Sequence, residues 1–157
     1  MKPVAVETAG ELLGPVEVVW ELLTDWERQT EWQREMSNIV VTSQHREGVG
    51  VEARATVRIG GISTTDLVRV DVWEPPTHLG LVHEGWVRGR GDIRLGPRPD
   101  ATTQMDWREE LWPPWGIVGA VGLRLFTPLL RRTFRRDVEI LGRLVRERSR
   151  DYPGGTV

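Results

Sequence analysis

Residues 127–150, TPLLRRTFRRDVEILGRLVRERSR, form the stretch around which the rest of the chain is expected to fold. Thr127 and Pro128 predict a helix start, because Thr can accept a hydrogen bond from a free first-turn amide and Pro fits the first helical position. Apolar residues then recur at steps of three or four and so share one face of the helix: Leu130, Phe134, Val138, Leu141 and Val145. The sequence therefore predicts a long amphipathic helix that needs an apolar surface to lie on.

Upstream of this helix, apolar residues alternate with polar ones, which is the period of β-strands. Two such runs, residues 49–59 and 62–72, flank Gly60-Gly61, a pair typical of a two-residue hairpin turn. Further alternating runs follow up to Leu111. Near the N-terminus, Gly14-Pro15 opens a helix, and residues 25–36 predict a second, shorter one. The predicted order is a strand, two short helices, about six antiparallel strands and one long helix.

The composition is that of a soluble globular protein, and we expect one domain over residues 1–157. Hydrophobic residues make up 39% and charged residues 28%, and the formal net charge is −2, which does not favour nucleic acid as a partner. The absence of Cys excludes disulfides and thiolate chemistry, and the three His show no metal-ligand spacing, so we expect neither metal nor cofactor. No signal peptide or membrane span is visible, so a cytoplasmic location is expected.

Charge is unevenly distributed along the chain. Residues 1–38 carry eight acids against three bases, whereas residues 124–150 carry nine Arg against three acids. The simpler interpretation is that the acidic early helices lie beside the basic last helix. The alternative is that the Arg-rich face docks on phosphates.

Three polar residues fall on the apolar faces of predicted strands: Asp66, His83 and Glu109. A carboxylate enclosed by apolar groups has its charged form destabilised, which suits general acid–base chemistry. Structural alternatives remain open for each residue. Asp66 could pair with an Arg across the sheet, His83 could be an ordinary sheet histidine, and a bulge could turn Glu109 to solvent. No basic residue shares the strand face of Glu109.

Two glycines, Gly89 and Gly91, fall on an inward strand face. Their missing side chains could provide cavity space, or they could mark a bulge that curves the sheet.

Three segments resemble the START/polyketide-cyclase (SRPBCC) superfamily: GPVEVVWELLTDWERQTEW (14–32), VRVDVWEPPTHL (68–79) and GPRPDATTQMDW (96–107). The resemblance covers roughly residues 3–148. It implies an α+β helix-grip fold, in which a curved antiparallel sheet of about six to seven strands wraps around the long C-terminal helix, with two short helices after the first strand. Members of the superfamily enclose an internal cavity for a hydrophobic ligand, and some are aromatases or cyclases.

The resemblance implies that the chain binds a small polyketide-, lipid- or sterol-like molecule. The enzymatic version is a polyketide cyclase or dehydratase that uses acid–base chemistry at Glu109, His83 and Asp66 without a metal. The alternative is a noncatalytic lipid carrier or a membrane-associated accessory protein whose Trp112–Phe126 segment touches a bilayer without spanning it. The residues expected to contact the ligand are Trp32, Val57, Val68, Met105, Trp107, Phe126, Leu130 and Phe134.

Overall fold

The computed structural model describes residues 2–86 and 88–153. The N-terminal part contains β1 (Val4–Leu12), the helix α1 (Val16–Thr24) and the short 3-10 helix η1 (Trp26–Glu31). The central strands are β2 (Met36–Val41), β3 (Glu52–Ile59), β4 (Ile62–Glu74), β5 (His78–Glu84), β6 (Arg88–Pro97) and β7 (Thr103–Trp112). The helix α2 (Gly116–Ser149) follows them.

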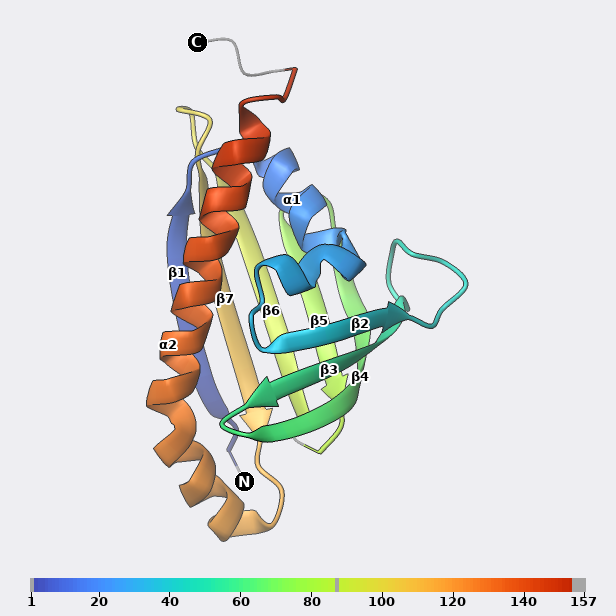
Figure 1. The fold of residues 1–157 in the computed structure, drawn as a ribbon, viewed down its shortest axis with the longest axis vertical. Helices are drawn as coiled ribbons and strands as arrows, with labels where there is room; N and C mark the ends of the chain where they lie inside the picture. The colour runs from blue at the N-terminus through green and yellow to red at the C-terminus, as the bar shows by residue number, and fades with distance from the viewer. Residues whose placement is uncertain (1, 87, 154–157) are drawn as a thin grey trace.

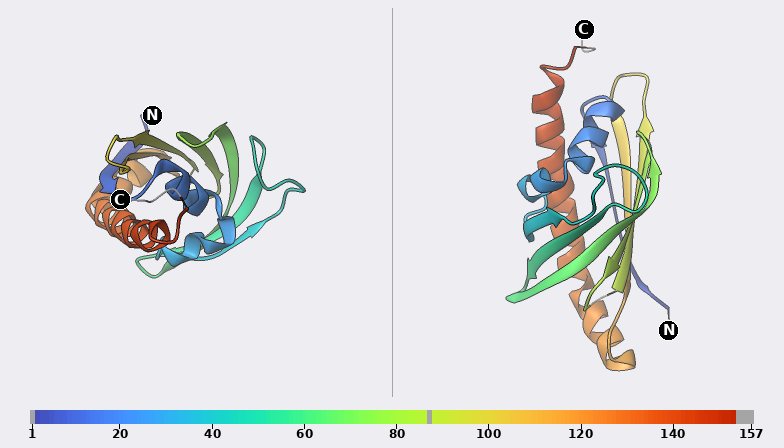
Figure 2. Two further views of the ribbon diagram at one scale, coloured as in Figure 1. Left: turned by 90° about the horizontal axis from the view of Figure 1, so that it is seen from above. Right: turned by 90° about the vertical axis from the view of Figure 1, so that its right-hand side faces the viewer.

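The seven strands form one antiparallel sheet in the order β1-β7-β6-β5-β4-β3-β2. The sheet curves strongly, and α2 lies along its open side, while α1 and η1 cover one end (Figures 1 and 2). The view from above in Figure 2 shows the sheet curling around the space beside α2. The predicted α+β helix-grip fold is confirmed, with seven strands.

The second half of α2 is held by close packing on β1. Its side chains Val138, Leu141 and Val145 are buried, as the apolar stripe predicts. Gly10 of β1 permits this approach, because a Cβ at that position would lie 2.7 Å from Cγ1 of Val138. Ion pairs from Arg136 to Glu35 and from Arg148 to Glu21 join the basic helix to the acidic N-terminal region. The simpler interpretation of the charge distribution therefore fits these two contacts.

The start of α2 differs from the sequence prediction. The helix begins at Gly116 rather than at Thr127, and Pro128 lies inside it. The hydroxyl of Thr127 does not cap a helix; it donates a hydrogen bond to the carbonyl of Leu123, 3.0 Å away. Near the start of this longer helix, the bare Cα of Gly119 leaves room for the carbonyl of Pro114 in the preceding turn. Pro128 removes one internal hydrogen bond, which the longer helix tolerates.

Two smaller predictions also need correction. The second short helix is the 3-10 helix η1, which is shorter than the predicted range of residues 25–36. In β4 the pairing register shifts between Val70 and Val72. The strand therefore turns Trp73 toward the core, where its ring contacts Trp20 edge-on at a centroid distance of 5.1 Å. A bulge of this kind breaks the simple alternation expected for residues 62–72.

Within the described part of the chain, no helix is both long enough and apolar enough to cross a membrane.

Candidate active site in the cavity

A cavity of about 370 Å³ lies between the concave face of the sheet and the first half of α2. Its lining is mostly apolar, and the polar side chains in it gather in two places. His83, Glu109, Asp66 and Thr64 come from the sheet. Gln33, Glu35 and Asp137 come from the segment after η1 and from α2.

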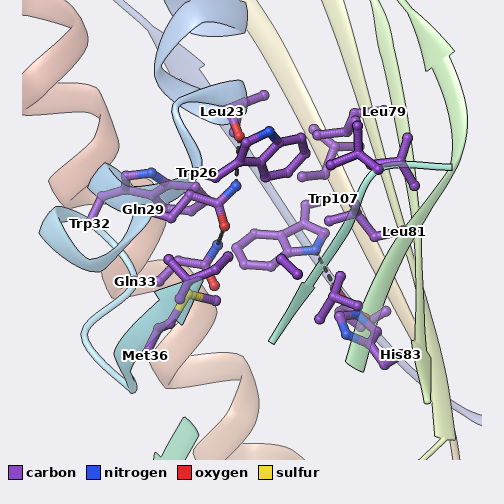
Figure 3. A pocket seen from close by; sticks show the side chains of 17 residues that line it. Leu23, Trp26, Gln29, Trp32, Gln33, Met36, Leu79, Leu81, His83 and Trp107 are labelled. Atoms are coloured by element: carbon purple, nitrogen blue, oxygen red, sulfur yellow. Dashed lines mark hydrogen bonds and ion pairs between the residues drawn. The ribbon is translucent and has the colours of Figure 1, made fainter. Parts of the chain in front are cut away.

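A smaller inner chamber of about 50 Å³ continues the cavity toward η1. Figure 3 shows Trp107 in the middle of its lining, with Trp26 and Trp32 nearby. Six residues line both spaces: Gln33, Met36, Val68, His83, Trp107 and Glu109. Trp107 is fixed by stacking on Phe134 at a centroid distance of 4.7 Å and by donating a hydrogen bond to Oε1 of Glu109, 2.9 Å away. Its indole therefore has a fixed position in the lining of both spaces.

The central polar contact joins His83 of β5 to Glu109 of β7. Nε2 of His83 lies 3.4 Å from Oε2 of Glu109, the separation of an ion pair, but it makes no aligned hydrogen bond. The Glu109 residue is buried, with 6% of its surface exposed. The expectation that nothing basic lies near Glu109 is wrong, because it considered one strand only and His83 comes from a different strand.

Glycines on the intervening strand make this contact geometrically possible. Strand β6 lies between β5 and β7, and its Gly89 and Gly91 pair with His83 and Glu109 respectively. A Cβ at position 91 would lie 2.5 Å from Oε1 of Glu109, and one at position 89 would lie 3.3 Å from Cδ2 of His83. The two glycines therefore leave room for both side chains to meet over β6.

The pKa of His83 reflects opposing influences. Burial, the largest one, lowers it, but the negative charge of Glu109, a side-chain interaction with that carboxylate and the charge of Asp66 together outweigh burial and raise the pKa. A larger fraction of His83 is therefore the imidazolium at neutral pH than for a free histidine. The pair can hold a proton donor and a proton acceptor side by side in an apolar cavity.

Asp66 lines the same cavity but already has hydrogen-bond partners. Its carboxylate accepts hydrogen bonds from the hydroxyl of Thr64 at 3.2 Å and from the backbone N–H of Trp86 at 3.2 Å. Gly85 leaves room for it, as Gly91 does for Glu109. Asp66 thus ties the β5–β6 turn to β4 and adds negative charge near His83, rather than pairing with an Arg among the described residues.

The sequence prediction missed a second acidic pair, Asp137 of α2 with Glu35. Burial, hydrogen bonding to Glu35 and the charge of Glu35 raise the pKa of Asp137 to about 8, against the opposing effects of the Arg34 amide and Arg136. Asp137 is 1% exposed and is therefore a neutral carboxylic acid at pH 7. The sequence contained a signal, because Asp137 lies three residues after Phe134 and four before Leu141, both in the predicted apolar stripe.

Seven of the eight residues expected to contact a ligand line one or both spaces. Trp32 lines the inner chamber, and Val68 and Trp107 line both. The large cavity is also lined by Val57, Phe126, Leu130 and Phe134. Met105 is a correction: it is fully buried in the hydrophobic core and lines neither space. Met105 does lie on the inward face of β7, but Trp107 separates it from the polar end of the cavity.

The mouth of the cavity is framed by aromatic side chains from three segments. Trp86 in the β5–β6 turn meets Trp115 edge-on, with ring centroids 5.4 Å apart. Phe126 of α2 lies next to the β3–β4 turn, where a Cβ at Gly60 would be 3.2 Å from its Cζ. Gly60 has a φ of 58°, a conformation that favours glycine.

Within residues 2–86 and 88–153, no three His, Asp or Glu side chains gather as metal ligands would.

Comparison with known proteins places this geometry in context. A family model described as "Polyketide cyclase / dehydrase and lipid transport" matches residues 3–146. No curated protein matches the chain.

Solved structures share the fold at low identity. The aromatase/cyclase Zhui from Streptomyces sp. R1128 is 17% identical and has a TM-score of 0.77, over 98% of this chain and 99% of that one. The protein TTHA0849 from Thermus thermophilus is 19% identical with a TM-score of 0.79, covering 93% and 99%. A START superfamily protein from Mycobacterium smegmatis is 15% identical with a TM-score of 0.69, covering 94% and 97%.

Proposed function

The chain belongs to the polyketide cyclase/dehydrase and lipid transport family, and from this premise we propose that it binds a small hydrophobic, carbonyl-bearing molecule in the cavity and catalyses proton transfer on it. A polyketide-like molecule has the required chemistry, since carbonyl groups alternate with acidic carbon atoms along its chain. The observation that carries the proposal is the contact of His83 with Glu109 at 3.4 Å inside a mostly apolar lining.

The roles follow from charge. The carboxylate of Glu109 removes a proton from a carbon next to a carbonyl group, and the resulting enolate carbon forms a bond to a second carbonyl carbon of the same molecule. The oxygen of that second carbonyl takes a proton from the imidazolium of His83 or from the neutral carboxyl of Asp137. In the dehydration, the neutral imidazole of His83 takes a second carbon-bound proton, and the hydroxyl leaves as water with the proton held by Glu109, which restores the imidazolium and the carboxylate.

The enclosing side chains support this chemistry by excluding water. Trp107 and Phe134 stack against each other beside Glu109 and cover it from the side of α2. A developing negative charge on a carbonyl oxygen is stabilised more strongly by nearby proton donors when water is absent.

A noncatalytic lipid carrier is the second candidate, and the mostly apolar lining favours it. In a carrier, His83 and Glu109 would bind one polar group of the ligand without exchanging protons with carbon. The two functions therefore differ in whether carbon-bound hydrogen is exchanged.

The test uses 2-tetralone, a bicyclic apolar ketone, in D₂O. Proton NMR follows the loss of its α-hydrogens, and broadening of its resonances shows whether it binds. We expect the wild-type protein to accelerate the exchange and Glu109→Gln to slow it by about 100-fold, the contribution of one general base. Glu110→Gln is the matched control, because the neighbouring Glu110 pairs instead with Arg108 outside the cavity.

Two results would count against catalysis: binding of 2-tetralone without accelerated exchange, or equal rates in Glu109→Gln and wild type. Native mass spectrometry of the freshly purified protein would then distinguish a carrier, which retains a hydrophobic molecule, from a protein whose cavity is empty.

A further inference from the structure

An apolar surface surrounds the cavity mouth, and we call it the apolar end. Its side chains come from the turn after β7, the first half of α2 and the β5–β6 turn: Trp86, Trp112, Trp115, Ile117, Val118, Val121, Leu125, Phe126 and Leu129. Ile117, Val118 and Leu125 are 80%, 76% and 77% exposed. Single exposed apolar residues are ordinary, but a contiguous group of this size marks an interaction surface.

The apolar end is confined to one end of the molecule. In Figure 1 the first turns of α2 and the turn after β7 extend beyond the ends of the strands, opposite the end covered by α1. The right-hand view of Figure 2 shows the same projection from a second direction. A flat surface could therefore contact these residues without meeting the rest of the fold.

The charged side chains of the segment that supplies most of the apolar end have one sign. Residues 111–136 contain five Arg and no Asp or Glu. Arg136 pairs with Glu35, whereas Arg124, Arg131 and Arg132 have no ion-pair partner among the described residues. A symmetric contact between two copies of this end would bring like charges together, which is unfavourable. A partner that is apolar inside and anionic at its boundary matches both the exposed apolar side chains and the Arg side chains.

We propose that the apolar end docks on the surface of a lipid bilayer that contains anionic lipids. The exposed face of residues 116–129 lies in the interface, the Trp side chains sit at the headgroup level, and the Arg side chains contact acidic headgroups. Three residues of the apolar end, Trp86, Trp115 and Phe126, also line the cavity, so its mouth faces the lipid in this orientation. A hydrophobic ligand then enters from the bilayer without crossing water.

The docking surface is independent of the chemistry proposed for the cavity. It rests on exposure and charge at residues 112–132, and it holds for an enzyme and for a carrier alike.

The test is co-sedimentation of the full chain with phosphatidylcholine vesicles that either contain or lack phosphatidylglycerol. We expect binding to the anionic vesicles that weakens as salt is added. Leu125→Glu and Ile117→Glu should each lower the partition coefficient by about ten-fold or more, because each places a charge on the inserted face. Arg131→Ser combined with Arg132→Ser should remove most of the preference for anionic vesicles.

Val49→Glu is the matched control, because Val49 is 62% exposed but lies in the β2–β3 loop, away from α2. It should bind vesicles as the wild type does. Unchanged circular dichroism and melting temperature establish that each variant is folded.

Two outcomes would overturn the proposal. One is equal vesicle binding by Leu125→Glu and wild type. The other is a wild-type protein that binds neither kind of vesicle. If that protein forms dimers that Leu125→Glu dissociates, the apolar end is instead an interface with a second copy of the chain.

Discussion

Gly91 of β6 lies directly opposite Glu109 of β7, and a Cβ at position 91 would be 2.5 Å from Oε1 of Glu109. The glycine therefore reserves the space in which the carboxylate reaches His83 on the strand beyond. Ordinary inward side chains at positions 89 and 91 would separate the side chains of His83 and Glu109, because β6 lies between their strands and neighbouring strands are about 4.8 Å apart.

Gly91→Ala should therefore alter the site more than the fold. The atom that the new methyl group meets is the end of a flexible side chain, so the protein should remain folded at a cost of about 1 kcal/mol, the low end for overpacking. The displaced carboxylate should leave His83, and the pKa of His83, measured by NMR titration, should fall. Gly96→Ala on the same strand is the control, because a Cβ there meets only Gln104, at ordinary contact distances of 3.8 and 3.9 Å. An unchanged His83 pKa in Gly91→Ala would contradict this view.

Glu109→Gln removes the main charge that opposes burial at His83, so the pKa of His83 should fall. The amide oxygen can still accept the hydrogen bond from Trp107. In the wild type, a His pKa raised by folding gives stability that is complete below the unfolded value of about 6.5 and is lost as pH rises through the folded value. Urea unfolding should therefore show a larger loss of stability for Glu109→Gln at pH 6 than at pH 9.

The control for that measurement is Glu110→Gln, which should leave the His83 titration unchanged. A loss of stability in Glu109→Gln that is the same at both pH values would show that the carboxylate does not stabilise the imidazolium.

Phe134→Ala tests whether Phe134 faces the cavity. Phe134 is only partly buried, stacks on Trp107 and lines the cavity, so part of its surface already borders space. The substitution should cost ~1–2 kcal/mol, below the ~3–5 kcal/mol typical of a fully packed Phe. Leu141→Ala, on the fully buried part of the same helix, should cost ~2–5 kcal/mol. Equal or larger loss at Phe134 in urea unfolding would mean that the site is packed.

The sequence predicted the fold well because its patterns are local. Alternation correctly placed Val51, Ala53 and Ala55 on the buried face of the sheet, and the Gly60-Gly61 pair correctly marked the hairpin turn. The start of α2 was wrong for a physical reason. Gly119 is required because the carbonyl of Pro114 lies close to it. In the sequence alone, a glycine at this position is typical of a loop.

The candidate site was harder to predict because it depends on register between strands. Alternation placed Glu109 and His83 on inward faces, but their contact requires that Gly89 and Gly91 of β6 fall opposite them. That register is set by the assembled sheet. Asp137 was missed because the inward stripe of the helix was defined by apolar residues alone, although burial and Glu35 raise the pKa of Asp137.

Asp137→Asn should change how stability depends on pH. The pKa of Asp137 is about 8 in the folded protein and about 3.8 when unfolded, so between these values the folded state holds the extra proton. Stability of the wild type should fall by about 1.4 kcal/mol per pH unit from this group as pH rises from about 5 to 7.5, and Asn should remove that slope. Denaturant unfolding across this range measures it, with the exposed Glu139→Gln as control. Parallel pH profiles for Asp137→Asn and wild type would contradict the raised pKa of Asp137.

The last prediction concerns the two halves of α2, whose amides should exchange with solvent at different rates. Residues 116–127 contain three glycines and carry the exposed apolar face, and Pro128 leaves the carbonyl of the preceding turn without a donor. Residues 130–145 are held by Val138, Leu141 and Val145 in the core, so their opening requires a larger part of the fold to unfold. Hydrogen–deuterium exchange measured by mass spectrometry should therefore be faster in the first half by about ten-fold or more. Anionic vesicles should slow the first half and leave the β6 amides unchanged, because only the apolar end enters the interface. Equal protection of both halves in the absence of vesicles would contradict this difference in local stability.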